Sequence, residues 1–338
     1  MKNILITGGA GYIGSHTAVA LVESGYTPII IDDFSNSEKS VLNGLKNILG
    51  KDVKTYVGDC NDKGLVQTIF KENKIDGVIH FAASKAVGES TKIPLKYYSN
   101  NIGSLLILLE VMKEYDVKNI VFSSSCTVYG QPDILPVLES TPRKEAESPY
   151  GNTKKICEDI LHDHVKSKAG VKVIALRYFN PIGAHPSSEI GELPIGVPAN
   201  LIPFVTQTAA GIREKITVFG SDYDTKDGSC VRDYIHVLDL ADAHVKSLEY
   251  LNTQQGDFID IFNVGTGNGN TVLEVIKAFE KVSGSDLNYE IGPRRAGDIE
   301  KVWANTDKVK NKLGWDPKFS LEDSLRDSWN WQKKLSGM

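Results

Sequence analysis

The chain has 338 residues, more than most single compact cores contain, which predicts one large domain or two coupled domains. Its hydrophobic content of 41%, charged content of 24% and formal net charge of −5 are typical of a globular protein. That charge gives no overall attraction to nucleic acid or anionic membrane, and no apolar run approaches the ~20 residues of a membrane span, so we expect neither partner.

A glycine-rich turn separates the first predicted strand from the first predicted helix. Residues 3–7 predict a buried parallel strand, and apolar residues then recur at helical spacing up to Gly25. Between them, Gly8 allows a sharp turn, Gly11 lets the backbone approach a pyrophosphate, and Gly14 allows close packing of helix on strand. The start of the helix supplies amide donors for phosphate. The motif therefore predicts a dinucleotide-binding fold.

The next two predicted strands each end in an acidic residue. Strand 28–31 leads to Asp32, about 20 residues after the glycines, where a carboxylate binds the adenosine ribose and repels a 2′-phosphate. We therefore expect NAD rather than NADP, although Asp32 could equally close the following turn, and the two roles are compatible. Strand 54–57 leads to Asp59, which either lies beside the adenine or belongs to a turn.

Strands 77–80 and 119–122 deliver small and hydroxyl side chains to the same edge of the sheet. After the first strand, Lys85 either reaches a ligand in the crevice or is solvated. The second strand is followed by three serines (Ser123, Ser124, Ser125), each of which could instead cap a helix. With strand 172–177, six strands alternate with helices and predict a doubly wound Rossmann sheet.

The predicted helix 104–114 is apolar on most of its faces. Such a helix must be covered on more than the side that meets the sheet. Either a subunit interface or a second domain would provide that cover.

Tyr150 and Lys154 follow a helix-starting Ser-Pro pair and are four residues apart. On a helix this spacing places both side chains on one face, where an ammonium stabilises a phenolate and lowers the tyrosine pKa from near ~10. A lysine together with a cationic cofactor could bring that pKa to about 7.

After Pro181 the composition changes. Residues 184–203 are rich in proline and glycine, and helices are expected at 236–250 and 271–282, with a strand and turn at 262–267. We predict an NAD-binding domain over residues 1–180, with the helix near 236–250 packing back on it, and a smaller loop-rich α/β substrate lobe over 181–338. Arg232 and Arg295 in this lobe suggest a second phosphate-bearing ligand, or surface salt bridges.

The four cysteines (Cys60, Cys126, Cys157, Cys230) are scattered without metal-ligand spacing. We therefore expect reduced thiols, no metal site and a cytoplasmic protein. The first seven residues run directly into the glycine turn and leave no room for a signal peptide.

Together these motifs resemble the extended short-chain dehydrogenase/reductase family, whose glycine motif has the spacing found in residues 7–14. The serine triplet and the Tyr-x-x-x-Lys motif belong to the same pattern. Within the family the resemblance narrows to the 4-epimerases of UDP-hexoses and covers essentially the whole chain, through residues 80–90, 177–186 and 227–237.

The resemblance implies NAD-dependent interconversion of UDP-glucose and UDP-galactose, with NAD reduced and reoxidised in each turnover. Tyr150 would take the proton of the sugar 4-hydroxyl while hydride leaves C4 for the nicotinamide. Lys154 would hold the nicotinamide ribose and lower the Tyr150 pKa, and Ser125 would hydrogen-bond the 4-oxygen. The 4-keto sugar would then rotate and receive the hydride on its opposite face. The family also implies a homodimer.

The expected cofactor-binding residues are those of the glycine turn, the acidic strand ends and the catalytic helix: Gly8, Gly11, Tyr12, Ile13, Gly14, Asp32, Asn36, Asp59, Cys60, Phe81, Ala82, Lys85, Asn100, Ser123, Tyr150, Lys154 and Tyr178. The expected substrate-binding residues come from both halves of the chain: Lys85, Ser125, Thr127, Tyr150, Phe179, Asn180, Asn200, Leu201, Arg232, Arg295, Asp298 and Val302.

Four positions depart from the family pattern. Thr153 replaces a frequent serine and keeps a hydroxyl, while Cys126 and Cys230 replace small residues and have no activating partner nearby in sequence. Val302 stands at a position where family members with tyrosine resemble enzymes confined to UDP-glucose and UDP-galactose. The smaller valine suggests that N-acetylated UDP-hexosamines are also accepted.

Three other functions fit the same fold. A nucleotide-sugar 4,6-dehydratase needs an Asp-Glu pair after the strand-five hydroxyls, where this chain has Cys126 and Thr127. A non-catalytic NAD-binding redox sensor typically lacks the tyrosine or the lysine, and this chain has both. An ordinary dehydrogenase would release NADH, which accumulates with turnover.

Overall fold

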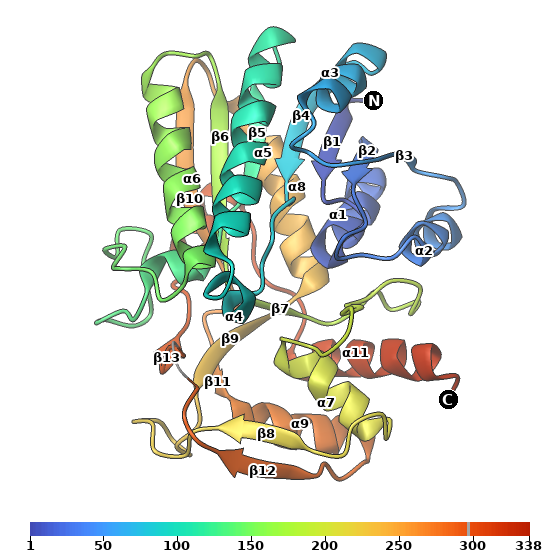
Figure 1. Cartoon of the computed structure of the whole chain (residues 1–338), viewed down its shortest axis with the longest axis vertical. Coiled ribbons are helices and arrows are strands. Elements are labelled where there is room, and N and C mark those ends of the chain that lie inside the picture. Colours follow the sequence, from blue (N-terminus) through green and yellow to red (C-terminus); the bar gives the residue numbers. More distant parts are fainter. Residues whose placement is uncertain (296–297) are drawn as a thin grey trace.

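The computed structural model describes residues 1–295 and 298–338, and its main element is a parallel sheet of seven strands (Figure 1). The strand order is β10-β6-β5-β4-β1-β2-β3, and each neighbouring pair is parallel. The order changes direction between β1 and β4, the position at which doubly wound sheets bind their ligands. The predicted fold class is confirmed. The bounds are β1 Asn3–Thr7, β2 Thr27–Asp32, β3 Lys54–Val57, β4 Ile75–His80, β5 Asn119–Ser123, β6 Lys172–Tyr178 and β10 Phe258–Val264.

Helices cover both faces of this sheet. Ile4 and Ile6 of β1 belong to the core on one face and Leu5 belongs to the core on the other, as the alternation of a strand requires. The first face is covered by α1 Tyr12–Glu23, α2 Ser40–Leu49, α8 Val237–Thr253 and α10 Asp307–Leu313. The second face is covered by α3 Lys63–Glu72, α5 Pro94–Glu114 and α6 Pro149–Lys166.

The seventh strand, β10, was not among the six predicted for the sheet. It pairs in parallel with β6 over seven residues, from Phe258↔Lys172 to Val264↔Tyr178. Its four leading residues are only partly buried, and Asp260 interrupts the apolar run, so only its last part was recognised as a strand. Like α8 and α10, β10 comes from the segment after residue 180 and packs on the large sheet. Where the domain boundary lies stays a prediction.

The long apolar helix α5 is covered within the chain. It begins at Pro94, ten residues before its predicted start, and it packs between α3 and α6. Leu105, Leu108 and Met112 are buried against the sheet, whereas Leu106 is 44% exposed. Neighbouring helices of the same sheet therefore provide most of the cover that the sequence assigned to a second domain or subunit.

The remaining elements form a separate group below the large sheet in Figure 1, built around β9. This strand pairs in parallel with β7 and β13 and in antiparallel with β11, while β8 pairs with β12. A third apolar core lies among α7, α9 and α11. The bounds are β7 Asn180–Ile182, β8 Ile216–Phe219, β9 Val231–His236, β11 Gly269–Thr271, β12 Tyr289–Gly292, β13 Lys301–Val302, α7 Leu201–Ala209, α9 Val272–Ser283 and α11 Leu321–Ser336, with the short α4 Val87–Ser90 and the 3₁₀ helix η1 Cys126–Tyr129 at the sheet edge.

Residues 184–203 were expected to lack long regular elements; residues 184–200 contain no helix or strand, but α7 begins within that range at Leu201. Across residues 1–295 and 298–338, none of the helices combines the length and apolar character needed to span a membrane.

Candidate active site

The glycine turn forms a tight cradle between β1 and α1. Gly8 has φ +68°, and a Cβ there would lie 3.0 Å from the backbone nitrogen of Ala82 after β4. A Cβ on Gly14 would lie 2.4 Å from the Gly8 carbonyl oxygen, so the start of α1 can pack on the turn only without a side chain. A Cβ on Gly11 would meet only that same oxygen, at 3.1 Å. The turn therefore leaves backbone accessible beside Gly11, where a pyrophosphate fits.

Asp32 closes the turns around this cradle. One carboxylate oxygen accepts the N–H of Ala10 at 2.9 Å, and the other accepts the N–H of Phe34 and the hydroxyl of Ser37, each also at 2.9 Å. Two carboxylate oxygens can accept about four hydrogen bonds, so capacity for a ribose hydroxyl remains. The two alternative roles of Asp32 are thus compatible in the structure.

The other residues expected around the adenosine are less enclosed. Asn36 and Asp59 are exposed, and Asp59 accepts the N–H of Asn61 at 2.8 Å in a turn. Cys60 is buried, and burial raises the pKa of its thiol. Tyr12 donates its hydroxyl to the carbonyl of Gly183 at 2.7 Å, so its ring joins the start of α1 to β7.

Tyr150 and Lys154 lie in the first turns of α6, which Ser148 caps by accepting the N–H of Gly151 at 3.2 Å. Lys154 donates from Nζ to the carbonyl oxygen of Ser123 at 2.6 Å. Its ammonium also lies 4.9 Å from the centre of the Phe122 ring. The lysine therefore connects the catalytic helix to the end of β5 and is itself 3% exposed.

Burial determines the pKa of both groups. It lowers the pKa of Lys154 to about 8, and the thiol of Cys157 and the carboxylate of Glu158 act weakly in the other direction. Burial raises the pKa of Tyr150, and Tyr178 raises it further, against a smaller lowering by the Ser125 hydroxyl. The lowering of the pKa predicted for this phenol beside lysine and a bound cationic cofactor stays a prediction. The protein's own groups favour the neutral phenol.

The three serines after β5 have different partners. Ser123 forms a hydrogen bond with the hydroxyl of Tyr178, and Ser124 donates to Glu158 inside the protein. Ser125 caps η1 by accepting the N–H of Thr127 at 3.2 Å, and its hydroxyl proton stays available to another acceptor. Ser124 is therefore structural, and Ser125 is the serine suited to bind a sugar oxygen.

Thr127 has a buried hydroxyl oxygen without a hydrogen-bond partner among the described residues. Buried polar groups are almost always paired, so such an atom needs an explanation. It lies on η1, two residues after Ser125, and a hydroxyl-rich ligand would provide the partner.

Two positions that support the site were missed in the sequence, Asn101 and Glu192. Asn101 accepts the N–H of Ser84, donates to the Ser84 carbonyl, and donates to the hydroxyl of Thr153 at 3.0 Å. Thr153 in turn donates to the carbonyl of Tyr150 at 2.7 Å. This chain of bonds connects the loop after β4 to the first turn of α6. An Asn-Asn pair inside an otherwise apolar helix was the signal that could have found it.

The predicted phosphate-binding residues lie together on β9 and just before β13. Arg232 and Arg295 both donate from Nη2 to one oxygen of Asp298, at 3.0 and 3.1 Å. The side chain of Arg295 is 55% exposed, and its guanidinium lies 5.7 Å from the centre of the half-exposed ring of Phe219. Two guanidinium groups that share one carboxylate keep donors for an anion.

A small apolar cluster extends from the β13 strand beside these basic residues to η1, the 3₁₀ helix after Ser125. Val302, 2% exposed, belongs to it with Phe179 and Cys126, the neighbour of Ser125. Val302 also pairs with Arg232 in the register of β13 and β9. Val302 therefore shares a cluster with the neighbour of Ser125 and is the strand partner of Arg232.

The remaining predicted residues are distributed over several elements of both halves of the chain. Asn180 begins β7, and Asn200 and Leu201 stand at the start of α7. Lys85 is half exposed, with Nζ 3.8 Å from a carboxylate oxygen of Glu192. Phe81, Ala82 and Asn100 lie partly buried in the β4 loop and in α5, and Ile13 packs partly buried in the sheet core.

The chain is similar to known proteins over most of its length. A family model described as GDP-mannose 4,6 dehydratase matches residues 5–328. The UDP-glucose 4-epimerase of Bacillus subtilis (strain 168) is 53% identical over 329 residues, which cover 97% of this chain and 96% of the relative. The chain belongs to the UDP-glucose 4-epimerase family.

Solved members of the UDP-glucose 4-epimerase family have the same fold. The enzyme of Bifidobacterium longum, solved in complex with NAD+ and UDP, has a TM-score of 0.95 and 47% identity, with 100% of both chains covered. The enzyme of Stenotrophomonas maltophila, solved with NAD and formylated UDP-arabinopyranose, has a TM-score of 0.97 and 44% identity, covering 100% of this chain and 99% of that chain. The family resemblance found in the sequence is confirmed.

The matching family model is described as a dehydratase, whereas the relatives named above are epimerases. The residues after β5 distinguish these two kinds of enzyme. A dehydratase needs an Asp-Glu pair there, whereas this member of the epimerase family has Cys126 and Thr127. Cys126 is buried in the apolar cluster, and burial raises its pKa to about 12, so its thiol cannot replace a carboxylic acid.

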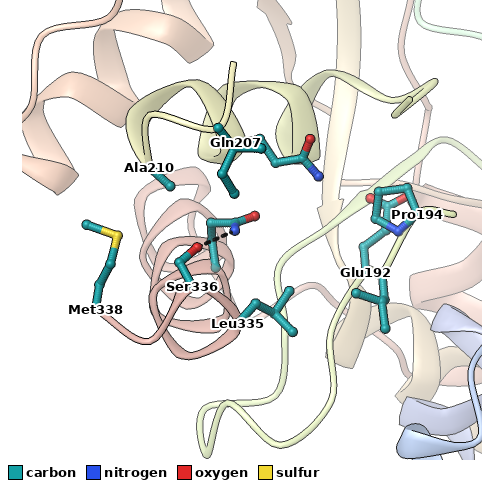
Figure 2. Close-up of a pocket in the computed structure, with 10 residues that line it drawn as sticks. Glu192, Pro194, Gln207, Ala210, Leu335, Ser336 and Met338 are labelled. Carbon is teal, nitrogen blue, oxygen red and sulfur yellow. Dashed lines mark hydrogen bonds between the residues drawn. The ribbon is translucent and has the colours of Figure 1, made fainter. Parts of the chain in front are cut away.

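A cavity of about 510 Å³ lies between α7 and the end of α11. Figure 2 shows Glu192 and Pro194 on one side of it and Met338 on the other. Gln332, which also lines the cavity, donates from Nε2 to the hydroxyl of Ser336 at 2.9 Å. Tyr150, Lys154 and Ser125 do not line this cavity. The epimerase site is therefore defined by its converging side chains and not by this cavity.

Proposed function

We propose that this protein interconverts UDP-glucose and UDP-galactose by oxidation and re-reduction at C4, with NAD as its cofactor. The observation that carries the proposal is the buried set of Tyr150, Lys154 and Ser125 beside the cluster that leads to Arg232 and its partner Asp298. Epimerisation at C4 needs a base at the sugar hydroxyl and a separate site for the UDP group. The relatives named above act on UDP-glucose according to their names, which supports the same assignment here.

The residues of the nucleotide domain fit NAD. The cradle of Gly8, Gly11 and Gly14 and the start of α1 would bind the pyrophosphate, and Asp32 would bind the adenosine ribose. Lys154, held at the Ser123 carbonyl, would donate a further hydrogen bond to the nicotinamide ribose. When bound, NAD supplies the acceptor and donor of the hydride exchanged with C4.

Tyr150 would act as the base at the 4-hydroxyl of the sugar. Because burial raises its pKa, the phenol needs a nearby positive charge to lose its proton, and the ammonium of Lys154 and the oxidised nicotinamide carry such charges. The hydroxyl of Ser125 would donate to the 4-oxygen, and the unpaired hydroxyl oxygen of Thr127 would accept a hydrogen bond from the sugar. The same phenol would return the proton after rotation of the 4-keto sugar.

Anchoring the UDP group lets the hexose rotate without leaving the site. Arg232 and Arg295 would bind the diphosphate, and their shared carboxylate of Asp298 keeps both guanidinium groups in place. The half-exposed ring of Phe219 beside Arg295 would stack on the uracil. Asn180 would contribute a further amide at the diphosphate.

The direct test is incubation of the purified protein with UDP-galactose without added NAD, with chromatographic separation of the sugar nucleotides. We expect UDP-glucose to form, and Tyr150→Phe provides the matched inactive control. Absence of product, even with NAD added, would contradict the proposal and favour the redox sensor. Accumulation of NADH with turnover would instead favour an ordinary dehydrogenase, and a 4-keto-6-deoxy product a dehydratase.

We also propose that N-acetylated UDP-hexosamines are substrates, because Val302 offers a small side chain in the same cluster as Phe179. Conversion of UDP-N-acetylgalactosamine is expected in the same assay, and Val302→Tyr is expected to remove it while UDP-galactose is still converted. Conversion that persists undiminished in Val302→Tyr would contradict this specificity role.

A homodimer in the cytoplasm completes the proposal. Leu95, 81% exposed, and Leu106, 44% exposed, are eleven residues apart on α5 and so share one helix face. This face would be part of the dimer interface. The four cysteines are buried and free of disulfides, which suits a reducing compartment. Sedimentation equilibrium of the wild type and of Leu106→Glu would test the dimer, since the added charge should dissociate it.

A further inference from the structure

Glu192 contacts two expected ligand-binding side chains that come from opposite sides of the site. Its Oε1 atom accepts a hydrogen bond from Nδ2 of Asn200 at 2.5 Å and lies 3.8 Å from Nζ of Lys85. Lys85 follows β4 of the large sheet, whereas Asn200 immediately precedes α7 of the second group of elements. One carboxylate oxygen therefore connects the two sides.

The backbone of Glu192 is fixed independently of these contacts. Trp331 of α11 donates from its indole nitrogen to the Glu192 carbonyl at 3.0 Å. Gly191 packs so closely on the same indole that a Cβ there would lie 2.5 Å from its ring, and Ile190 is fully buried in the sheet core. Glu192 is thus carried by a rigid segment, and Figure 2 shows it beside Pro194 at the edge of the cavity.

Exposure differs sharply among the three side chains. The Glu192 side chain is 12% exposed and that of Lys85 is 50% exposed, while Asn200 is exposed as a residue. Burial raises the pKa of Glu192, and Lys85 and the Asn200 amide act against it by favouring the carboxylate. The least exposed of the three groups is therefore the carboxylate, and the two more exposed side chains are the ones expected to contact the ligand.

Donors remain after these contacts are made. An ammonium has three N–H groups and a side-chain amide has two, so Lys85 and Asn200 each keep at least one donor when they face Glu192. Both residues are expected to bind the ligand, and their remaining donors belong to two different segments that meet at Glu192.

We propose that Glu192 is a positioning residue for the UDP-sugar, which holds Lys85 and Asn200 so that their free N–H groups face one anionic part of the ligand. This inference rests on the proposed function. Without Glu192, two flexible side chains would have to be ordered at the moment of binding, which weakens affinity. The reacting atoms at C4 are not touched, so the chemical step should be preserved.

The test is steady-state kinetics of Glu192→Ala with UDP-galactose. We expect KM to rise about tenfold, as for loss of a hydrogen bond to a charged group, while kcat stays within about twofold. Glu192→Gln should restore part of the affinity because its amide oxygen can still accept from Asn200. The matched control is Glu189→Gln, which removes a carboxylate of the same segment that binds Lys334 and Asn47 and should leave KM unchanged.

Three results would overturn the inference. The first is an unchanged KM in Glu192→Ala, and the second is a fall in kcat equal to the rise in KM. The third is a rise in KM that is just as large when Glu192→Ala is made in a protein that already carries Asn200→Ala. The last comparison distinguishes positioning from a general structural effect, because the effect of Glu192 should shrink once its partner is absent. If the wild type converts no UDP-galactose, the proposed function fails. The positioning role of Glu192 is then tested separately by calorimetry of UDP binding. An affinity of Glu192→Ala for UDP equal to that of the wild type would contradict this role.

Discussion

At the scale of single residues, the chemistry depends on what burial does to two side chains on one helix face. The Tyr-x-x-x-Lys spacing indicated the pair, but it implied a tyrosine pKa below the ordinary value, and the buried phenol is shifted upward. The ammonium of Lys154 donates a hydrogen bond to the carbonyl of Ser123 and so holds the end of β5. Burial is the largest cause of the raised pKa of the Tyr150 phenol.

Tyr150→Phe removes only the phenolic oxygen from α6. We expect kcat for UDP-galactose to fall by about 10²–10⁴-fold, because the base at the 4-hydroxyl is lost. The buried ring keeps its packing, so the melting temperature should change little. Rates and thermal unfolding of both proteins provide the check, and activity near the wild-type level would exclude Tyr150 as the base.

Lys154→Met tests the pKa of the buried lysine. Its folded pKa of about 8 lies below its ordinary value of 10.5, so within that window the unfolded chain binds more protons and wild-type stability rises with pH. Below about pH 8 the full cost of burying the charge is present. The free energy of unfolding of the wild type, relative to Lys154→Met, should therefore increase as pH rises through this window.

Denaturant unfolding of both proteins below, within and above the window measures that difference. The exposed lysine Lys51 offers a control, since Lys51→Met should show no comparable trend. A difference between wild type and Lys154→Met that does not change with pH would show that the lysine is not destabilised by burial.

At the scale of elements, the close approach of α1 to the turn after β1 depends on Gly14. A Cβ there would lie 2.4 Å from the Gly8 carbonyl oxygen and 2.8 Å from Cα of Gly9, both backbone atoms that cannot move independently. Gly14→Ala should therefore destabilise the fold by about 1–3 kcal/mol and weaken NAD binding by moving the start of α1.

Denaturant unfolding and NAD titration measure these two effects. Gly88→Ala is the matched control, because no atom lies within 4 Å of a Cβ in the short helix α4 and alanine favours a helix. Unchanged NAD affinity in Gly14→Ala would show that the turn tolerates a side chain.

At the scale of the whole molecule, a buried network joins segments that are distant in sequence. Arg177 of β6 donates from Nε and Nη2 to the two carboxylate oxygens of Glu158 on α6, at 2.9 and 2.6 Å. It also donates to the hydroxyl of Tyr129 at 3.0 Å, and its guanidinium lies 4.9 Å from the centre of that ring. Ser124 donates to the same carboxylate, so the network fixes β5, β6, η1 and α6 together.

Arg177→Met leaves the buried carboxylate of Glu158 without its main partner. Breaking such a pair typically costs about 3–5 kcal/mol, whereas Lys310→Met, at an exposed pair with Asp316, should cost far less because solvent screens that pair. The double variant with Glu158→Leu should recover part of the loss. Denaturant unfolding measures all three, and a loss of similar size for Arg177 and Lys310 would contradict a structural role for the network.

The sequence by itself determined the features that depend on local spacing. Alternation and apolar runs predicted the first six strands of the sheet, and the glycines predicted the turn. The spacing of Tyr150 and Lys154 predicted that both lie on one face of a helix. Each of these patterns is contained within a few neighbouring residues. These are properties of neighbouring residues in one element.

Only the tertiary structure decided the features that depend on long-range pairing and burial. It added β10 to the sheet, separated the structural Ser124 from Ser125, and showed that Asn101 connects the loop after β4 to Thr153 of α6. It also placed Glu192 against Asn200. Desolvation and contacts between residues distant in the chain cause these differences, and no local spacing contains them.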